Sequence, residues 1–186
     1  NTQRRKEAEM SKPDYFASLG GLSKQTELLT GRAVFTESYA VIPKGVMQDI
    51  VTSNIPFWEG TRAWVLARPM TGFAETFSQY IMEVQPGGGS ARPETEEGAQ
   101  AALFVVSGEL ELTLDGRIYK LSPGSFAYIP HTSDWQAWNR GSSSVTFHWI
   151  RKAYEAVEGI ELPDSIIVNE QDITPTPKKG NGDLNC

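Results

Sequence analysis

The side chains best suited to chemistry lie together in a short acidic stretch. Glu94, Glu96 and Glu97 follow a Pro-Gly-Gly-Gly run at residues 86–89. Neighbouring carboxylates can bind a hard cation or share a proton. Acidic loop residues are mostly solvated, however, and an exposed loop is the interpretation that we favour. We therefore do not predict a metal site from these carboxylates, and keep Glu94 and Glu96 only as candidate pocket residues.

Few other side chains could ligate a metal or transfer a proton. The chain has two histidines and one cysteine among its 186 residues, too few for the three or four ligands of a zinc site. His131 follows a proline in a predicted turn, where a pocket acid or base is one interpretation and a surface or capping residue the other. His148 alternates out of phase with Val145, Phe147 and Trp149, so we expect it to face outward or to bond within its strand.

A β-rich fold must position these residues. The chain contains 17 Gly and 11 Pro, which separate runs of alternating apolar and polar residues. Leucines at 110, 112 and 114 have the period of a half-buried strand, and Asp115-Gly116 suits the tight turn that follows. Strands are predicted at residues 33–36, 39–42, 63–67, 74–84, 102–106, 109–114, 117–121, 125–129, 135–138 and 144–150. No segment has the pattern of a long amphipathic helix, so we predict an all-β sandwich or small jelly-roll barrel.

Charge and composition exclude several classes of partner. The net charge is −6 and no Lys/Arg cluster occurs, which argues against nucleic-acid binding. The longest apolar run, residues 101–106, is far too short to span a membrane. No signal-peptide pattern opens the sequence, and the lone Cys186 forms no internal disulfide, so we expect a cytoplasmic protein.

Two glycine-centred blocks at residues 86–112 and 121–139 resemble the two motifs of the cupin superfamily. The residues that shape the cupin backbone are present: Gly108 closes the first motif, and Gly124, Pro130 and Asn139 fall in register in the second. The resemblance implies a cupin-type double-stranded β-helix, a jelly-roll barrel of the RmlC-like kind.

The metal ligands of the cupin motifs are absent. Ala101 stands at the glutamate position with Gln100 beside it, and the first two histidine positions fall within residues 94–97. Trp135 stands at the third histidine position, and its indole N–H cannot ligate a metal. Trp135 and Trp138 are expected to fill the barrel rather than to form a stacking platform. We therefore expect no metal in this barrel.

The ordered series of segments at residues 38–45, 60–89, 104–112, 124–139 and 147–159 resembles the ureidoglycine aminohydrolases. The resemblance covers roughly residues 20–173. Members of that family carry two tandem cupins and release ammonia from ureidoglycine to give ureidoglycolate, within allantoin and purine catabolism. Manganese sits in the second cupin, and the first has lost its ligands.

The resemblance implies that this chain is the metal-less, N-terminal cupin of a truncated bicupin, a hydrolase half that is inactive without the manganese-binding second cupin. We expect a tail at residues 1–19, the cupin domain at 20–159, and a linker with an irregular tail at 160–186. The expected partner is the second cupin or another copy of the chain.

Two other functions remain open. A stand-alone, metal-free cupin could bind or sense a small molecule, and a metal enzyme could use Glu94 and Glu96 with His131. No catalytic residue is predicted. The candidate pocket residues are Glu94, Glu96, Gln100, Tyr128, His131 and Trp135.

Overall fold

The computed structural model describes residues 34–35, 40–41, 53–67 and 76–174. The chain divides into two compact units, residues 1–51 and 52–186. In the first unit, β1 (Val34–Phe35) pairs antiparallel with β2 (Ala40–Val41). Both strands fall inside the predicted segments 33–36 and 39–42, whose other residues lie outside the described ones.

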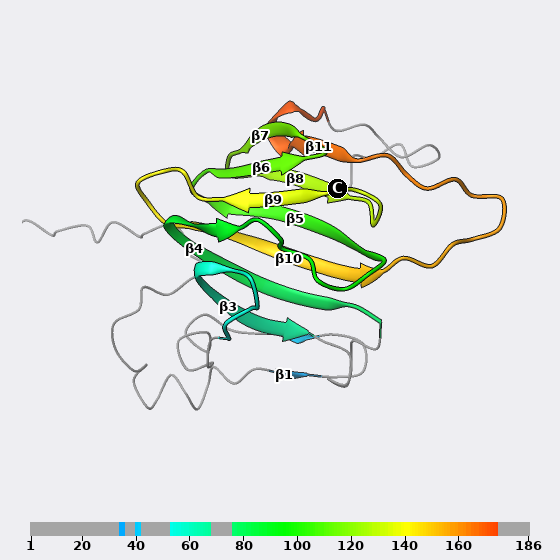
Figure 1. Ribbon diagram of the computed structural model, residues 1–186, viewed down its shortest axis with the longest axis horizontal. Coiled ribbons are helices and arrows are strands. Elements are labelled where there is room, and N and C mark those ends of the chain that lie inside the picture. The colour runs from blue at the N-terminus through cyan, green and yellow to red at the C-terminus, as the bar shows by residue number, and fades with distance from the viewer. Residues whose placement is uncertain (1–33, 36–39, 42–52, 68–75, 175–186) are drawn as a thin grey trace, which may run out of the picture. The chain divides into compact units, whose positions relative to one another are not determined.

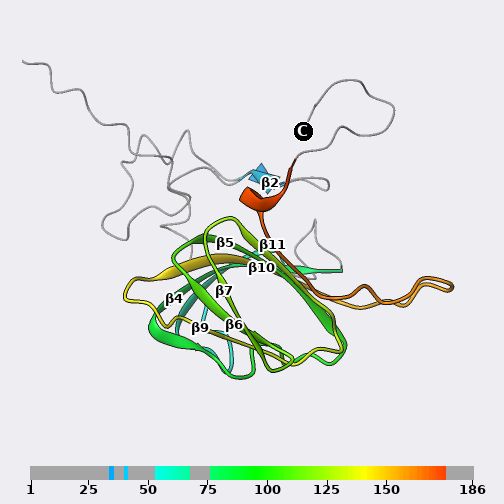
Figure 2. The same ribbon diagram turned by 90° about the horizontal axis from the view of Figure 1, so that it is seen from above.

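The second unit contains a nine-stranded antiparallel sheet that curls into a nearly closed barrel (Figures 1 and 2). Its strands are β3 (Glu59–Ala67), β4 (Ser78–Ser90), β5 (Ala99–Ser107), β6 (Leu110–Leu114), β7 (Arg117–Leu121), β8 (Ser125–Ile129), β9 (Trp135–Trp138), β10 (Val145–Ala153) and β11 (Ile166–Asn169). The order across the sheet is β11-β8-β5-β10-β4-β9-β6-β7, and β3 pairs with β4. The predicted all-β barrel is confirmed.

Most predicted strands are present, with shifted ends. Strands β7, β8 and β9 have the predicted bounds, whereas β3, β5 and β10 are longer than predicted. Strand β4 begins at Ser78 and continues through the Pro-Gly-Gly-Gly run to Ser90. Strand β11 was not predicted and lies in the segment expected to be a linker and tail. It pairs with β8 and leads into η1 (Glu170–Asp172), a single 3₁₀ turn.

Alternating side chains fill the barrel. Leu110, Leu112 and Leu114 on β6 are buried as their period predicts. The β6–β7 turn is the predicted Asp-Gly hairpin, in which Asp115 and Gly116 adopt φ of 48° and 78°. In the described part of the chain, no helix is long and apolar enough to cross a membrane.

The cupin-motif asparagine ties the turn after β9 to β4. Asn139 is fully buried, and its Nδ2 donates to the carbonyl oxygens of Val84, at 2.9 Å, and Ser143, at 2.8 Å. Its Oδ1 accepts from the Gly141 N–H at 2.9 Å. A buried amide with all of these partners fixes the turn that leads into β10, so this motif residue has a structural role.

Candidate functional site

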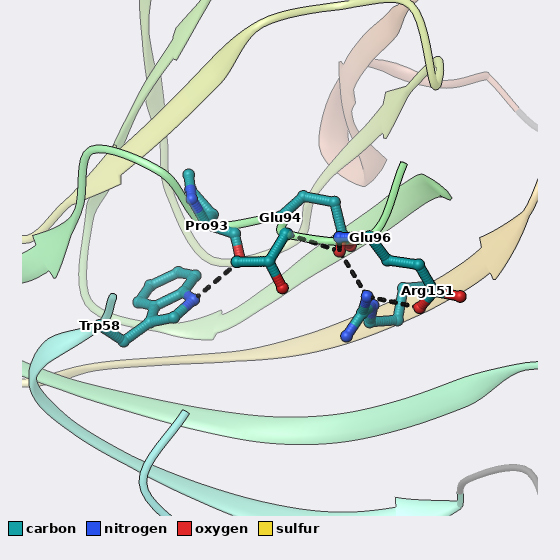
Figure 3. A network of polar contacts seen from close by, with 6 residues as sticks. Trp58, Pro93, Glu94, Glu96 and Arg151 are labelled. Carbon is teal, nitrogen blue, oxygen red and sulfur yellow. Dashed lines mark hydrogen bonds and ion pairs between the residues drawn. The ribbon is translucent and has the colours of Figure 1, made fainter. Parts of the chain in front are cut away.

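The loop between β4 and β5 places an acidic side chain against a largely buried arginine (Figure 3). Glu94 Oε1 accepts from the backbone N–H groups of Thr95 and Glu96, both at 2.9 Å. The same oxygen forms an ion pair with Arg151 Nη2, which also contacts Glu96 Oε2 at 2.9 Å. The Arg151 and Glu94 side chains are only 16% and 11% exposed, whereas Glu96 is 63% exposed. The Arg151–Glu94 pair is thus the buried centre of this network.

The pleat of β10 explains why a guanidinium lies there. Val145, Phe147 and Trp149 are fully buried on the inner face, and Arg151 follows at the same spacing of two residues. Its guanidinium carbon lies 5.4 Å from the centroid of the Trp149 ring, within the range of a cation–π contact. Sequence reasoning missed Arg151, although the alternation that buried the preceding residues also predicts its direction.

Aromatic rings fill the barrel beside this ion pair. The Trp58 ring centroid lies 5.7 Å from that of Trp149, 6.1 Å from Phe147 and 6.5 Å from Trp135. The Trp135 and Trp149 rings meet edge to face at 5.9 Å. Trp58 Nε1 also donates to the Pro93 carbonyl at 3.3 Å, which ties the acidic loop to the cluster (Figure 3). Trp135, only 8% exposed, packs as barrel filler.

A pocket of about 540 Å³ opens beside these residues. Three parts of the chain form its wall: the β4–β5 loop, the β8–β9 loop with the start of β9, and the β6–β7 hairpin region. The lining residues are Ala91, Arg92, Pro93, Glu94, Glu96, Glu97, Gly98, Ala99, Thr113, Gly116, His131, Ser133, Asp134, Trp135 and Gln136. A volume of this size is typical of a small-molecule site.

Four of the six candidate pocket residues line this pocket: Glu94, Glu96, His131 and Trp135. The acidic stretch is not a fully solvated loop, because the Glu94 side chain is only 11% exposed. The His131 ring stacks on Tyr154, with centroids 4.5 Å apart and planes 10° from parallel, and its Nδ1 is buried without a hydrogen-bond partner. The pocket wall thus includes an imidazole held in place by a tyrosine.

Gln100 and Tyr128 do not line the pocket. They bond to each other on neighbouring strands, with Tyr128 Oη donating to Gln100 Oε1 at 2.7 Å. The buried residues of β8 are Ser125, Ala127 and Ile129, so the pleat turns Tyr128 to the opposite face of the sheet. Burial and then the nearby Tyr154 raise the pKa of Tyr128. These two candidates lie outside the barrel interior, because each alternates with the buried residues of its own strand.

The interior side chains of this barrel do not fit a cupin metal site. Ala101 at the glutamate position is buried and has no ligating atom, and Trp135 at the third histidine position is packed among aromatic rings. Both Glu94 and Glu96 are paired with Arg151. Within the described residues, no group of three or more His, Cys, Asp and Glu side chains is placed to hold an ion. The side chains at the cupin ligand positions therefore do not form the donor set that manganese has in that pattern.

The remaining histidine lies on β10, between the inward-facing residues. His148 is half-buried, between Phe147 and Trp149 in sequence, and pairs with Phe104 and Ile81 across the sheet. Burial lowers its pKa below the ordinary value. It is not among the pocket residues, so it contributes to the sheet rather than to the candidate site.

Comparison with known proteins shows what this barrel is similar to. Residues 80–151 match the family model described as Cupin domain. This stretch runs from β4 through β10 and includes the Glu94–Arg151 pair and the pocket. Over this stretch the barrel is therefore similar to the cupin domains, and it has the same type of fold.

Individual relatives share more of the chain. A putative glyoxylate-induced protein from Pseudomonas aeruginosa has 52% sequence identity and a TM-score of 0.75, and the match covers 90% of this chain and 61% of that one. Protein Ylba from E. coli has 26% identity and a TM-score of 0.69, with 82% and 61% covered. The (S)-ureidoglycine aminohydrolase of Escherichia coli K12 is 27% identical over 135 residues, which are 72% of this chain and 49% of the relative. The chain thus spans about half the length of this curated relative.

Proposed function

We propose that this chain is the metal-free, non-catalytic cupin half of a protein related to ureidoglycine aminohydrolase. The observation that carries the proposal is the filling of the barrel: Ala101 and Trp135 stand at two ligand positions of the cupin pattern, and Glu94, in the segment of the other two, is paired with Arg151. In this proposal, ammonia release from ureidoglycine, and the manganese that it requires, belong to a second cupin. This half contributes fold and contacts to that partner or to another copy of the chain.

The similarity to the E. coli aminohydrolase supports this role. The aligned 135 residues take in most of this chain but only 49% of the relative, which leaves room there for a second domain of similar size. The resemblance places the catalytic metal of that family in the second cupin. A first cupin whose interior holds aromatic side chains and an ion pair is compatible with a catalytic metal in the second cupin alone.

The test combines an activity measurement with a metal measurement. The purified chain is incubated with ureidoglycine and Mn²⁺, and ammonia release is compared with a no-protein blank and with the E. coli relative as positive control. We expect release by the relative and none above the blank by this chain, with circular dichroism confirming the β-fold. Metal analysis after dialysis is expected to find no stoichiometric manganese. Ammonia release proportional to the concentration of the chain, and lost on chelation, would overturn the proposal.

A second candidate function is supported by the pocket. A metal-free cupin that binds a small molecule needs a preformed cavity of suitable size, and the 540 Å³ pocket meets this condition. Its lining is rich in charged groups rather than sealed by Trp135. This candidate predicts saturable binding of a small molecule without turnover, and it is compatible with a non-catalytic half of a larger protein.

A further inference from the structure

One oxygen of the buried carboxylate in the pocket wall is without a partner. Glu94 Oε1 accepts from two backbone N–H groups and from Arg151, whereas Oε2 is buried and has no hydrogen-bond partner. An ionised carboxylate only accepts hydrogen bonds, so Oε2 needs a donor. Leaving a buried acceptor unsatisfied is unfavourable. A donor from outside the chain would complete the shell of Glu94.

The charges around the pocket favour a positively charged donor. Four carboxylates line it, those of Glu94, Glu96, Glu97 and Asp134, against the single guanidinium of Arg92. Arg151 pairs with the first two, but Glu97 and Asp134 form no ion pair with any described residue. A half-enclosed wall with an excess of one charge concentrates ligands of the opposite charge. The lining therefore selects against anions.

The aromatic part of the wall adds to this preference. Trp135 lines the pocket while its ring packs against Trp58 and Trp149 in the barrel. Because neighbouring rings hold the indole in place, it presents a fixed surface to an occupant. Tryptophan is the aromatic side chain that attracts organic cations most strongly. Carboxylates and an indole around one cavity are the groups that recognise ammonium and guanidinium ligands.

We propose that this pocket binds a small organic cation carrying a primary ammonium or guanidinium group. The N–H groups of the ligand donate to Glu94 Oε2 and to the carboxylates of Glu97 and Asp134, and its apolar part lies against Trp135. Entry of the ligand shifts the Glu94 side chain enough to uncover Oε2, with Oε1 remaining on Arg151. This inference rests on the second candidate function, in which the pocket is a binding site, and it names the class of ligand.

Four matched probes test the charge preference: n-butylammonium, methylguanidinium, butyrate and 1-butanol. Binding is followed through the indole N–H resonances of the full chain at low ionic strength. We expect saturable shifts with both cations, at concentrations about tenfold or more below those at which butyrate or butanol acts. Added salt weakens the binding of the cations, since the carboxylates are partly exposed to solvent.

Carboxylate-to-amide variants locate the site. Glu94→Gln is expected to weaken n-butylammonium binding about tenfold or more, because it removes the charge at the buried acceptor. Since that change also disturbs Arg151, Glu97→Gln serves as a second variant outside the ion pairs, with an expected weakening of a few-fold. Glu109→Gln is the matched control: its carboxylate is exposed, pairs with Lys120 and does not line the pocket. Affinity in this control is expected to equal that of the unmodified chain.

The outcomes separate this inference from the functions on which it rests. Butyrate or butanol binding as tightly as the cations overturns the cationic class while leaving the pocket a binding site. Equal affinities for Glu97→Gln, Glu94→Gln and Glu109→Gln variants overturn the assignment to these carboxylates. Binding of none of the four probes overturns both the cationic class and the second candidate function. The ammonia and manganese measurements test the non-catalytic cupin half independently of these results.

Discussion

Arg151 provides the most direct test of how the barrel is stabilised. Substitution Arg151→Met keeps an unbranched apolar stem against Trp149 but removes the charge that faces Glu94. Both side chains of this ion pair are largely buried, so the change leaves a carboxylate in the barrel wall without its cation. Breaking a buried pair in this way typically costs about 3 kcal/mol or more in the free energy of unfolding. For a chain of this length, we expect the melting temperature to fall by about 6–12 °C.

Urea unfolding followed by circular dichroism measures this loss. Lys120→Met is the matched control, because the Lys120–Glu109 pair is 71% and 55% exposed, and such surface pairs contribute at most about 1 kcal/mol. The double variant Arg151→Met/Glu94→Gln is expected to be less destabilised than the sum of the two single variants, since neither partner then remains charged and alone. A loss for Arg151→Met no larger than that for Lys120→Met would refute the assignment of Arg151 as a buried, stabilising partner.

Three further substitutions test other parts of the barrel. Asn139→Ala removes a buried donor from the Val84 carbonyl and is expected to cost about 2–3 kcal/mol in urea unfolding, with an unchanged m-value. Gly89→Ala places a Cβ 2.3 Å from the Ala137 carbonyl oxygen, so β9 must shift and the melting temperature must fall; an unchanged value contradicts this packing. Burial lowers the pKa of His148 from its ordinary 6.5, so the unfolded chain takes up this proton first as pH falls, and stability decreases below about pH 6.5. His148→Gln is expected to reduce that decrease, as measured by urea titrations on either side of pH 6.5.

The period-two patterns predicted the strands well where one face is buried. Leu110, Leu112 and Leu114 lie inside the barrel, as their spacing indicates. The Asp115-Gly116 turn follows from local chemistry alone, because few residue pairs tolerate positive φ at both positions. By contrast, β11 pairs only at the edge of the sheet, with half of its residues exposed. A strand that buries little has no strong pattern, which explains why residues 166–169 were predicted as linker.

The candidate site shows where residue type misleads. Tyr128 has a side chain suited to a pocket, yet the smaller Ser125 and Ala127 face the interior of the barrel. Ala127 belongs to the same buried cluster as Trp149 of β10 and Trp135 of β9. The size of the side chains on the inner face of β8 thus depends on residues from other strands, which the sequence of β8 alone does not reveal. Arg151 was not among the candidate residues, although the alternation along β10 predicts that it points inward.

The cupin pattern in this chain divides into two sets of residues with different physical tasks. Gly108 and Asn139 have structural roles in the backbone. A Cβ at Gly108 would lie 2.7 Å from the Ser144 carbonyl oxygen, and Asn139 bonds its own turn to β4. The close backbone approach at Gly108 and the hydrogen bonds of Asn139 belong to the barrel backbone and do not depend on which side chains line the interior. The interior positions carry no such constraint, provided that volume is filled and charge is compensated. Trp135 meets the first condition, and Arg151 meets the second by supplying a cation to Glu94. The fold of this barrel therefore does not depend on metal-ligating side chains at these interior positions.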